Sequence, residues 1–293
     1  MDIGSKIKQL RTEKLMTQSE LAGSEITRNM LSQIENGIAL PSISTVIYLA
    51  KRLGVSAGFL LADENDNFIY KKTTTMKNIK KAFMDKSFEI CRDLCVSELD
   101  ETDDEIRLIL AHCAINLAIE NVCDGKLRRA CEEIDRAILH AESTIYNTVS
   151  VRNCAYVLLD FLRKMSPTLD CVEIYEDISD RKYTVSAFED PFCKYIIALD
   201  SLDTDCLDES VPEEKLYKMH IEAKTQIAKQ NYEGALEILK SLINSDQVPS
   251  KILLYLSSAD LEICCKETED FRGAYEHSQN KISLLEYMLS DIG

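Results

Sequence analysis

Residues 17–37 read TQSELAGSEITRNMLSQIENG and decide how the N-terminal part of the chain folds. Thr17 and Glu20 have the spacing of a capping box, which predicts a helix that begins after Thr17. Thr27 is suited to cap a second helix, and Gly37 is suited to end it. The stretch therefore predicts two short helices joined by a tight turn.

The second of these helices has an apolar face and a polar face. Leu31 and Ile34 point inward because residues three apart share one side of a helix. The opposite face carries Arg28, Asn29, Ser32, Gln33 and Asn36. Arginine, glutamine and asparagine are suited to bidentate hydrogen bonds with guanine and adenine edges. The pattern predicts a helix-turn-helix, which places its second helix in the DNA major groove.

A longer stretch, from about residue 3 to residue 61, resembles the phage-repressor-like (Xre-type) DNA-binding domain, which has five helices. The matching segments are IxxKIKQLRxEKxxTQxELA, ITRNMLSQIENG, PSISTVIYLAKRLGVS and FLL. The resemblance implies that Arg11 is buried and pairs with Glu35. It also implies DNA contacts, with Arg28, Asn29 and Gln33 at base-reading positions and Gln18 and Asn36 at phosphates. We add Thr27 and Ser32 to this predicted DNA-binding face.

The turn departs from the family pattern. Its residues, GSEI at 23–26, are one fewer than usual, and the glycine that normally precedes Thr27 is missing. Because the turn sets the tilt of the second helix, this departure leaves open which bases are read.

The helices on either side complete the expected small core. The first is predicted from about Gly4 to Lys14. The fourth is predicted to begin after Ser42, to end at Gly54, and to bury Ile43, Val46, Ile47, Ala50 and Leu53.

Composition points to an almost entirely helical protein of two domains. The chain has 293 residues but only 9 Gly and 5 Pro, few helix breakers for this length. It has no run of about 18 apolar residues and no basic, apolar leader, so we expect neither a membrane span nor a secretory signal. The expected location is the cytoplasm.

The 11 cysteines are odd in number and show no CxxC spacing. Most, such as Cys113 and Cys154, fall on apolar helix faces, which predicts buried free thiols in a reducing compartment. The pair Cys91 and Cys95 and the adjacent residues 264–265 leave a metal site or redox switch as an alternative. No histidine lies near them to complete tetrahedral coordination, so we expect no metal and no cofactor.

Charge is divided unevenly. Residues 1–62 carry seven Lys or Arg against five Asp or Glu, a balance of +2, whereas the whole chain carries −16. Residues 63–293 therefore carry −18, and so acidic a segment repels phosphate. We expect only the N-terminal domain to contact double-stranded DNA. Its weak positive charge predicts that a homodimer on a pseudo-palindromic operator is needed for tight binding.

The clearest boundary is the polar stretch from Asp63 to Asn67 followed by KKTTT at 71–75. It predicts a DNA-binding domain at 1–68 and a helical domain at 69–293. Helices are predicted near 76–98, 103–123, 127–142, 149–165, 170–181, 190–202, 212–229, 232–245, 250–266 and 271–290.

Three of these helices begin like the second helix of a tetratricopeptide repeat. The clearest start is NYEGALEIL at 231–239, with weaker echoes in FRGAY at 271–275 and LRRAC at 127–131. Each puts an alanine where paired helices touch, and Ala118 and Ala223 are the small residues of two preceding helices. The predicted fold class is all-α, a tetratricopeptide-like helical-repeat solenoid behind the DNA-binding domain. An irregular helical bundle is the alternative.

A helix-turn-helix domain joined to such repeats resembles the peptide-pheromone-sensing regulators of Gram-positive bacteria. The resemblance implies that the repeats bind a short peptide and form the dimer. Asn116 and Asn153 are candidate peptide clamps because an amide offers paired donors and acceptors. Tyr195 and Tyr255 are candidates to line the groove. The alternatives are asparagines that bond a neighbouring helix or face water, and tyrosines that belong to the core.

Motifs of catalysis are missing from the sequence. It has no Walker-type loop, no GxGxxG and no HExxH, and its four histidines are scattered. We expect a transcriptional regulator rather than an enzyme, with a peptide or protein as ligand. A partner-binding adaptor and a constitutive repressor without a small ligand are the alternatives.

Overall fold

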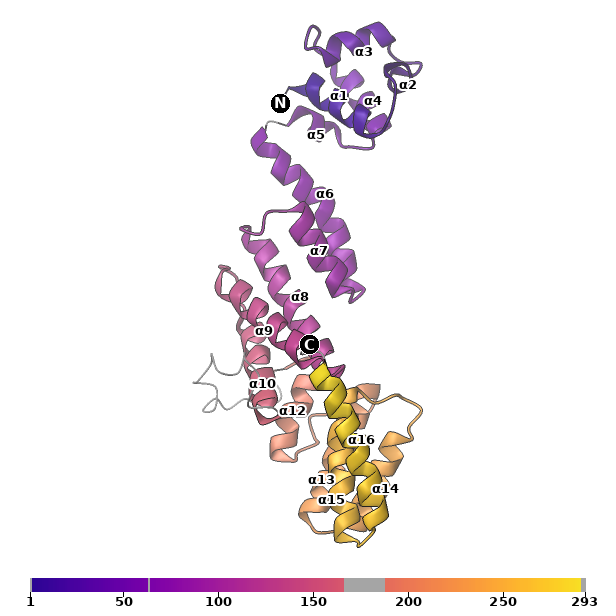
Figure 1. Ribbon diagram of the computed structural model, residues 1–293. Coiled ribbons are helices and arrows are strands. Elements are labelled where there is room, and N and C mark those ends of the chain that lie inside the picture. The colour runs from indigo at the N-terminus through magenta and orange to yellow at the C-terminus, as the bar shows by residue number, and fades with distance from the viewer. Residues whose placement is uncertain (1, 63, 166–187, 291–293) are drawn as a thin grey trace. The chain divides into compact units, whose positions relative to one another are not determined.

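The computed structural model describes residues 2–62, 64–165 and 188–290. The described part is helical and contains no strand (Figure 1). The chain divides into two compact units, the first of residues 1–85 and 93–100, the second of residues 86–92 and 101–293.

The first unit contains the five predicted small helices. They are α1 (Ile3–Glu13), α2 (Gln18–Ala22), α3 (Arg28–Glu35), α4 (Ile43–Leu53) and α5 (Ala57–Leu61). Ile7, Leu21, Leu31 and Leu49 have no exposed surface and form one cluster with further apolar residues. This core packs against one side of α3, so the opposite side of the helix faces solvent.

The structure corrects the predicted inner face of α4. Val46, Ala50 and Leu53 are buried as expected, but Ile43 and Ile47 are 74% and 54% exposed. The buried residues follow the i, i+4, i+7 spacing of one helix face, and Ile43 and Ile47 lie beside that row. Apolar character alone did not show which edge of the helix faces inward.

The predicted link between the domains is also different. Residues 64–75 belong to a long helix, α6 (Glu64–Met84), and the single helix predicted at 76–98 is divided into the end of α6 and α7 (Phe88–Glu98). The chain turns between them, where Lys86 has a φ of 55°.

The second unit continues as a series of helices. They are α8 (Asp104–Cys123), α9 (Leu127–Glu142), α10 (Val149–Met165), α12 (Pro191–Ser201), α13 (Pro212–Ala228), α14 (Tyr232–Ile243), α15 (Lys251–Glu267) and α16 (Phe271–Ser290). Each agrees with its predicted helix to within a few residues. The helix predicted at 170–181 lies outside the described residues.

Three helix pairs pack side by side along this unit: α8 with α9, α13 with α14, and α15 with α16 (Figure 1). Alanines lie where the predicted repeats require them. Ala118, Ala130, Ala223 and Ala235 have no exposed surface, and Ala274 is buried. A small side chain lets two helices approach closely, and stacked pairs bury one another's faces. The described body is thus built as a tetratricopeptide-like repeat.

Helix α8 is the one described helix that is long and apolar enough to span a membrane, and half of its apolar window is buried within the fold. Ile115, Ala118 and Val122 of this helix belong to the main core cluster. Such burial is expected of the central helix of a folded core.

One cysteine expectation is wrong. Cys154 of α10 and Cys193 of α12 are joined by a disulfide, whereas Cys154 was expected to be a free thiol. The two residues are 39 positions apart in sequence. Only the packing of α10 against α12 brings them together, so no spacing motif marks the pair.

Candidate functional site

Hydrogen bonds at their N-termini define both helices of the predicted helix-turn-helix. The Thr17 hydroxyl accepts a hydrogen bond from the Glu20 N–H at 3.1 Å, and the Glu20 carboxylate accepts one from the Thr17 N–H at 2.7 Å. The Thr27 hydroxyl accepts from the Met30 N–H at 3.1 Å. The predicted capping box and second cap are therefore present, and α3 begins where the sequence indicated.

The turn obtains its glycine from an unexpected position. Gly23 ends α2 with a φ of 59°, a conformation that favours glycine. A Cβ atom at this position would also clash with the hydroxyl of Tyr48, which donates a hydrogen bond to the Ala22 carbonyl oxygen at 3.0 Å. The glycine missing before Thr27 is thus replaced by one four residues earlier.

Helix α3 presents its polar face to solvent. Leu31, Ile34 and Glu35 are buried against the first unit's core. Exposed or half-exposed on the other side are Thr27, Arg28, Asn29, Ser32, Gln33 and Asn36. The structure therefore brings all the predicted base-reading residues onto one accessible surface.

Met30 also belongs to this surface, although the sequence analysis did not select it. Its side chain is 37% exposed. An apolar side chain next to Asn29 on the outer face is suited to contact a thymine methyl group. In the sequence, the position of Met30 between polar residues of a capped helix is the feature that could have marked it as part of this surface.

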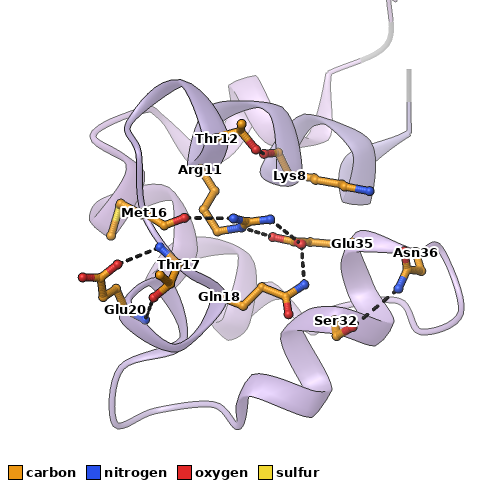
Figure 2. A network of polar contacts seen from close by, with 10 residues as sticks. All are labelled: Lys8, Arg11, Thr12, Met16, Thr17, Gln18, Glu20, Ser32, Glu35 and Asn36. Atoms are coloured by element: carbon orange, nitrogen blue, oxygen red, sulfur yellow. Dashed lines mark hydrogen bonds and ion pairs between the residues drawn. The ribbon is translucent and has the colours of Figure 1, made fainter.

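A buried ion pair holds α3 to α1 (Figure 2). The Arg11 guanidinium donates to both carboxylate oxygens of Glu35, at 2.7 and 3.1 Å, and to the Met16 carbonyl oxygen at 2.8 Å. The Glu35 side chain is 1% exposed and the Arg11 side chain 14%. The hydrogen bond from Arg11 to Glu35 raises the pKa of Arg11, so the guanidinium stays protonated at neutral pH.

Gln18 of α2 joins the same network. Its side-chain N–H donates to the second Glu35 carboxylate oxygen at 2.8 Å (Figure 2). A glutamine amide has two N–H donors and a carbonyl oxygen, so one donor remains for the predicted phosphate contact. Glu35 thus connects three helices directly beneath the outer face of α3.

A close approach of backbones supplements this ion pair. Gly4 of α1 is buried, and a Cβ atom there would clash with the Ile34 carbonyl oxygen. Glycine at this position lets the start of α1 lie against the backbone of α3.

The second unit contains a pocket of about 480 Å³. Residues from α8, α10 and the start of α12 line it, among them Asn116, His112, Ser150, Glu189 and Asp190. Burial raises the pKa of the Asp190 carboxyl and lowers that of the His112 imidazole. The pocket combines the carboxyl groups of Glu189 and Asp190 with the ammonium group of Lys86 and with apolar walls, so it offers polar groups of both charge signs.

The two asparagine candidates have different surroundings. The Asn116 side-chain N–H donates to the His112 carbonyl oxygen at 2.7 Å, one turn back in α8. The side-chain carbonyl oxygen of Asn116 can therefore accept hydrogen bonds from other donors. Asn153 is half-buried on α10 but is not among the residues that line the pocket.

Tyr195 belongs to the core and not to a groove. It has no exposed surface, stacks on Tyr217 with ring centroids 4.4 Å apart, and its hydroxyl lies 2.8 Å from Nδ1 of His220. His220 Nε2 is 3.1 Å from the Asp260 carboxylate. Tyr255 is half-buried against the same core cluster. Sequence periodicity marks a tyrosine as inward-facing but does not distinguish a groove from a core.

Among residues 2–62, 64–165 and 188–290, no three His, Cys, Asp or Glu side chains come together as metal ligands. Cys91 and Cys95, for which a metal site was an alternative, are both fully buried.

Comparison with known proteins identifies the N-terminal domain. Residues 7–60 match the family described as helix-turn-helix, so this part of the chain is a helix-turn-helix DNA-binding domain. No curated protein matches the chain in sequence.

Several solved structures are similar over most of the chain. PlcR of Bacillus thuringiensis, in complex with the peptide PapR7 and DNA, is 16% identical over 99% of this chain and 96% of its own, with a TM-score of 0.25. ComR of S. thermophilus, in complex with DNA and its signalling peptide ComS, is 18% identical over 97% and 99%, with a TM-score of 0.25. The SHP pheromone receptor Rgg2 of Streptococcus dysgalactiae is 12% identical over 96% and 99%, with a TM-score of 0.20.

We expect Glu35→Ala to destabilise the N-terminal domain by about 3 kcal/mol, because it leaves the Arg11 charge buried without its partner. Thermal unfolding of the isolated residues 1–68 measures this. Glu13→Ala is the control, because Glu13 is exposed and accepts only a surface hydrogen bond from Gln9, so its effect should stay within about 0.5 kcal/mol. Equal melting curves for Glu35→Ala and the unmodified domain would contradict a stabilising role for the pair.

Proposed function

We propose that the protein is a cytoplasmic transcriptional regulator that binds a pseudo-palindromic DNA operator as a homodimer. The observation that carries this proposal is the outer face of α3. Arg28, Asn29 and Gln33 are exposed there, on a helix whose inner face is buried. These side chain types recognise base edges in the major groove. A capped and buried inner face positions them, which sequence-specific reading requires.

The distribution of charge supports binding through the N-terminal domain alone. Residues 1–62 carry +2 and the remainder of the chain −18. One domain with so little positive charge gains little from counterion release. Two linked copies on two half-sites raise the overall affinity through effective concentration.

We further propose that a peptide or protein ligand bound by the helical body controls DNA binding. The resemblance to repeat-containing pheromone sensors motivates this proposal, and the pocket beside Asn116 offers a place for such a ligand. The net charge of the body, −18, favours a neutral or basic ligand, although the pocket itself is lined by Lys86 as well as by Glu189 and Asp190. A ligand shifts DNA affinity only if it binds the DNA-competent and incompetent forms differently.

A constitutive repressor or a partner-binding adaptor with no small ligand is the alternative function. Either would keep the DNA-binding face of α3 and would show no peptide-dependent change in DNA affinity.

The recognition helix should determine which DNA is bound. We expect Arg28→Ala or Gln33→Ala to weaken operator binding by about 1–3 kcal/mol and to change binding to random DNA little. The operator is obtained by in vitro selection with the full chain, and fluorescence anisotropy gives both affinities. Gln9→Ala is a matched glutamine control, because Gln9 is exposed on α1. An equal loss on both DNAs would mean that α3 does not read bases.

The body should hold the homodimer. We expect residues 69–293 alone to sediment as a dimer at micromolar concentration, and the full chain to select half-sites about one helical turn apart, or a multiple of it. Analytical ultracentrifugation and the spacing in selected DNA check this. A monomeric body would refute it.

Asn116 should contribute to the ligand response. Calorimetry of the full chain against fractionated culture supernatant tests for a ligand, and DNA titration with an active fraction tests its effect. We expect Asn116→Ala to weaken the peptide response and to leave peptide-free operator binding intact.

Asn121→Ala is the matched control for this experiment. Asn121 also lies half-buried on α8 and donates to a carbonyl oxygen one turn back, that of Leu117 at 2.9 Å, but it does not line the pocket. If no fraction binds, or if a ligand binds without shifting the DNA titration, the peptide-sensor proposal is wrong.

A further inference from the structure

The disulfide between Cys154 and Cys193 lies at the pocket of the second unit. Cys154 of α10 is 8% exposed and is the one cysteine among the described residues that lines this pocket. Cys193 lies in the first turn of α12 and has no exposed surface. The bond therefore joins a sulfur that a small molecule in the pocket can reach to one that it cannot reach.

The expected compartment makes this bond unusual. Disulfides are rare in the cytoplasm, where thiols are kept reduced, and those that form there are usually transient and either catalytic or redox-sensing. A redox-sensing pair combines an accessible cysteine with a second cysteine beside it that completes the disulfide. Cys154 and Cys193 have these two positions.

Other cysteines are less suited to react with an oxidant. Burial raises the pKa of Cys123 to about 12 and the pKa of Cys264 to about 11. The thiolate is the reactive form, so these two side chains stay protonated and inert at neutral pH. Cys206 is half-exposed but is not bonded to a second cysteine.

We propose that Cys154 and Cys193 are a peroxide-sensing pair whose oxidation fixes the walls of the ligand pocket. This inference rests on the proposed function, because it requires the cytoplasmic location and the ligand pocket. The oxidant is a small hydroperoxide such as hydrogen peroxide, which is small enough to enter the pocket and reach Cys154.

The reaction uses one hydrogen peroxide for each pair of thiols. The Cys154 sulfur attacks the O–O bond and takes one oxygen as a sulfenic acid, while the other oxygen leaves as water with the proton of the thiol. The Cys193 sulfur then attacks the sulfenic sulfur, so that the S–S bond forms and a second water leaves. The two thiols lose two electrons and two protons, and the peroxide is reduced to two molecules of water.

The disulfide connects two walls of the pocket. Cys154 belongs to the wall formed by α10, and Asp190 belongs to the wall formed by the start of α12. The Asp190 carboxylate accepts hydrogen bonds from the N–H groups of Phe192 and Cys193, at 2.9 and 3.0 Å. Because of these hydrogen bonds, a restraint on Cys193 is also a restraint on Asp190.

The contact between α10 and α12 does not depend on the bond alone. Phe192 is buried and packs edge-to-face on Phe161 of α10, with ring centroids 5.6 Å apart. The reduced chain therefore keeps α12 against α10, and oxidation adds a covalent restraint. The pocket that accompanies the bond, about 480 Å³, has the size of a ligand site, and a pre-formed site loses less conformational entropy on binding.

The redox state of the full chain in the cytoplasm is the first test. Cells that express the chain are quenched with acid, with or without prior exposure to hydrogen peroxide, and free thiols are alkylated and located by mass spectrometry. We expect both thiols to be reduced in untreated cells and joined after peroxide. A disulfide under both conditions would make the bond a permanent structural one, and its absence after peroxide would mean that the pair does not react. Either result overturns the proposal.

Cys193→Ser separates the roles of the two cysteines. When the purified, reduced full chain of this variant is treated with hydrogen peroxide, the sulfenic acid should remain on Cys154, where dimedone captures it. Cys154→Ser should give no dimedone adduct on Cys193, because Cys193 does not reach the pocket. Cys206→Ser is the control and should form the disulfide at the unmodified rate. An adduct on Cys193, or none on Cys154, would contradict the assignment.

Hydrogen exchange measures the effect on the pocket wall. We expect the amide hydrogens of α12 to exchange at least about tenfold more slowly in the oxidised full chain than in the reduced one, with no change in α14. Cys193→Ser should show the reduced rate with and without peroxide, which excludes an effect of other cysteines. Equal rates in both redox states of the unmodified chain would overturn the proposal. These measurements use neither DNA nor culture supernatant, so failure to select an operator would refute the proposed function alone.

Discussion

The buried ion pair of Arg11 and Glu35 is the interaction on which the DNA-binding surface depends. A carboxylate this deeply buried is costly unless it is paired and hydrogen-bonded. Glu35 receives both kinds of partner, because Arg11 reaches it from α1 and Gln18 from α2. The charge is therefore satisfied only when α1, α2 and α3 have one relative arrangement. That arrangement also fixes the direction in which Gln33 and its neighbours project.

Two glycines make this arrangement sterically possible. Gly4 permits the start of α1 to lie against the carbonyl of Ile34, and Gly23 turns the chain beneath the hydroxyl of Tyr48. A side chain at Gly4 would press on the backbone of α3, and one at Gly23 would be strained at a φ of 59° and would displace the Tyr48 hydroxyl. The turn of this protein thus differs from the family pattern in the position of its glycine. Helix α3 still begins after its expected N-terminal cap, Thr27.

The helical body follows a different physical rule. Its pairs of helices are held by small residues at points of contact and by apolar faces that stacking buries. Buried polar groups occur here as well, and the clearest are His220 and Asp260 beneath Tyr195. Burial opposes ionisation of Asp260, but the hydrogen bond from His220 and the charge of Lys224 lower the pKa of Asp260. The proposed ligand pocket lies among other residues, near the start of α12.

The sequence by itself determined the features that depend on residues within about one helical turn. Caps at Thr17 and Thr27, apolar spacing along α3, and small residues such as Ala118 and Ala235 predicted where helices begin and which faces pair. The tertiary structure alone decided which apolar residues meet a neighbour. It left Ile43 and Ile47 exposed, placed Tyr195 in the core, and joined Cys154 to Cys193. Helix caps and apolar periodicity depend on residues that are close together in the sequence, whereas burial depends on contacts between helices that are distant in the sequence.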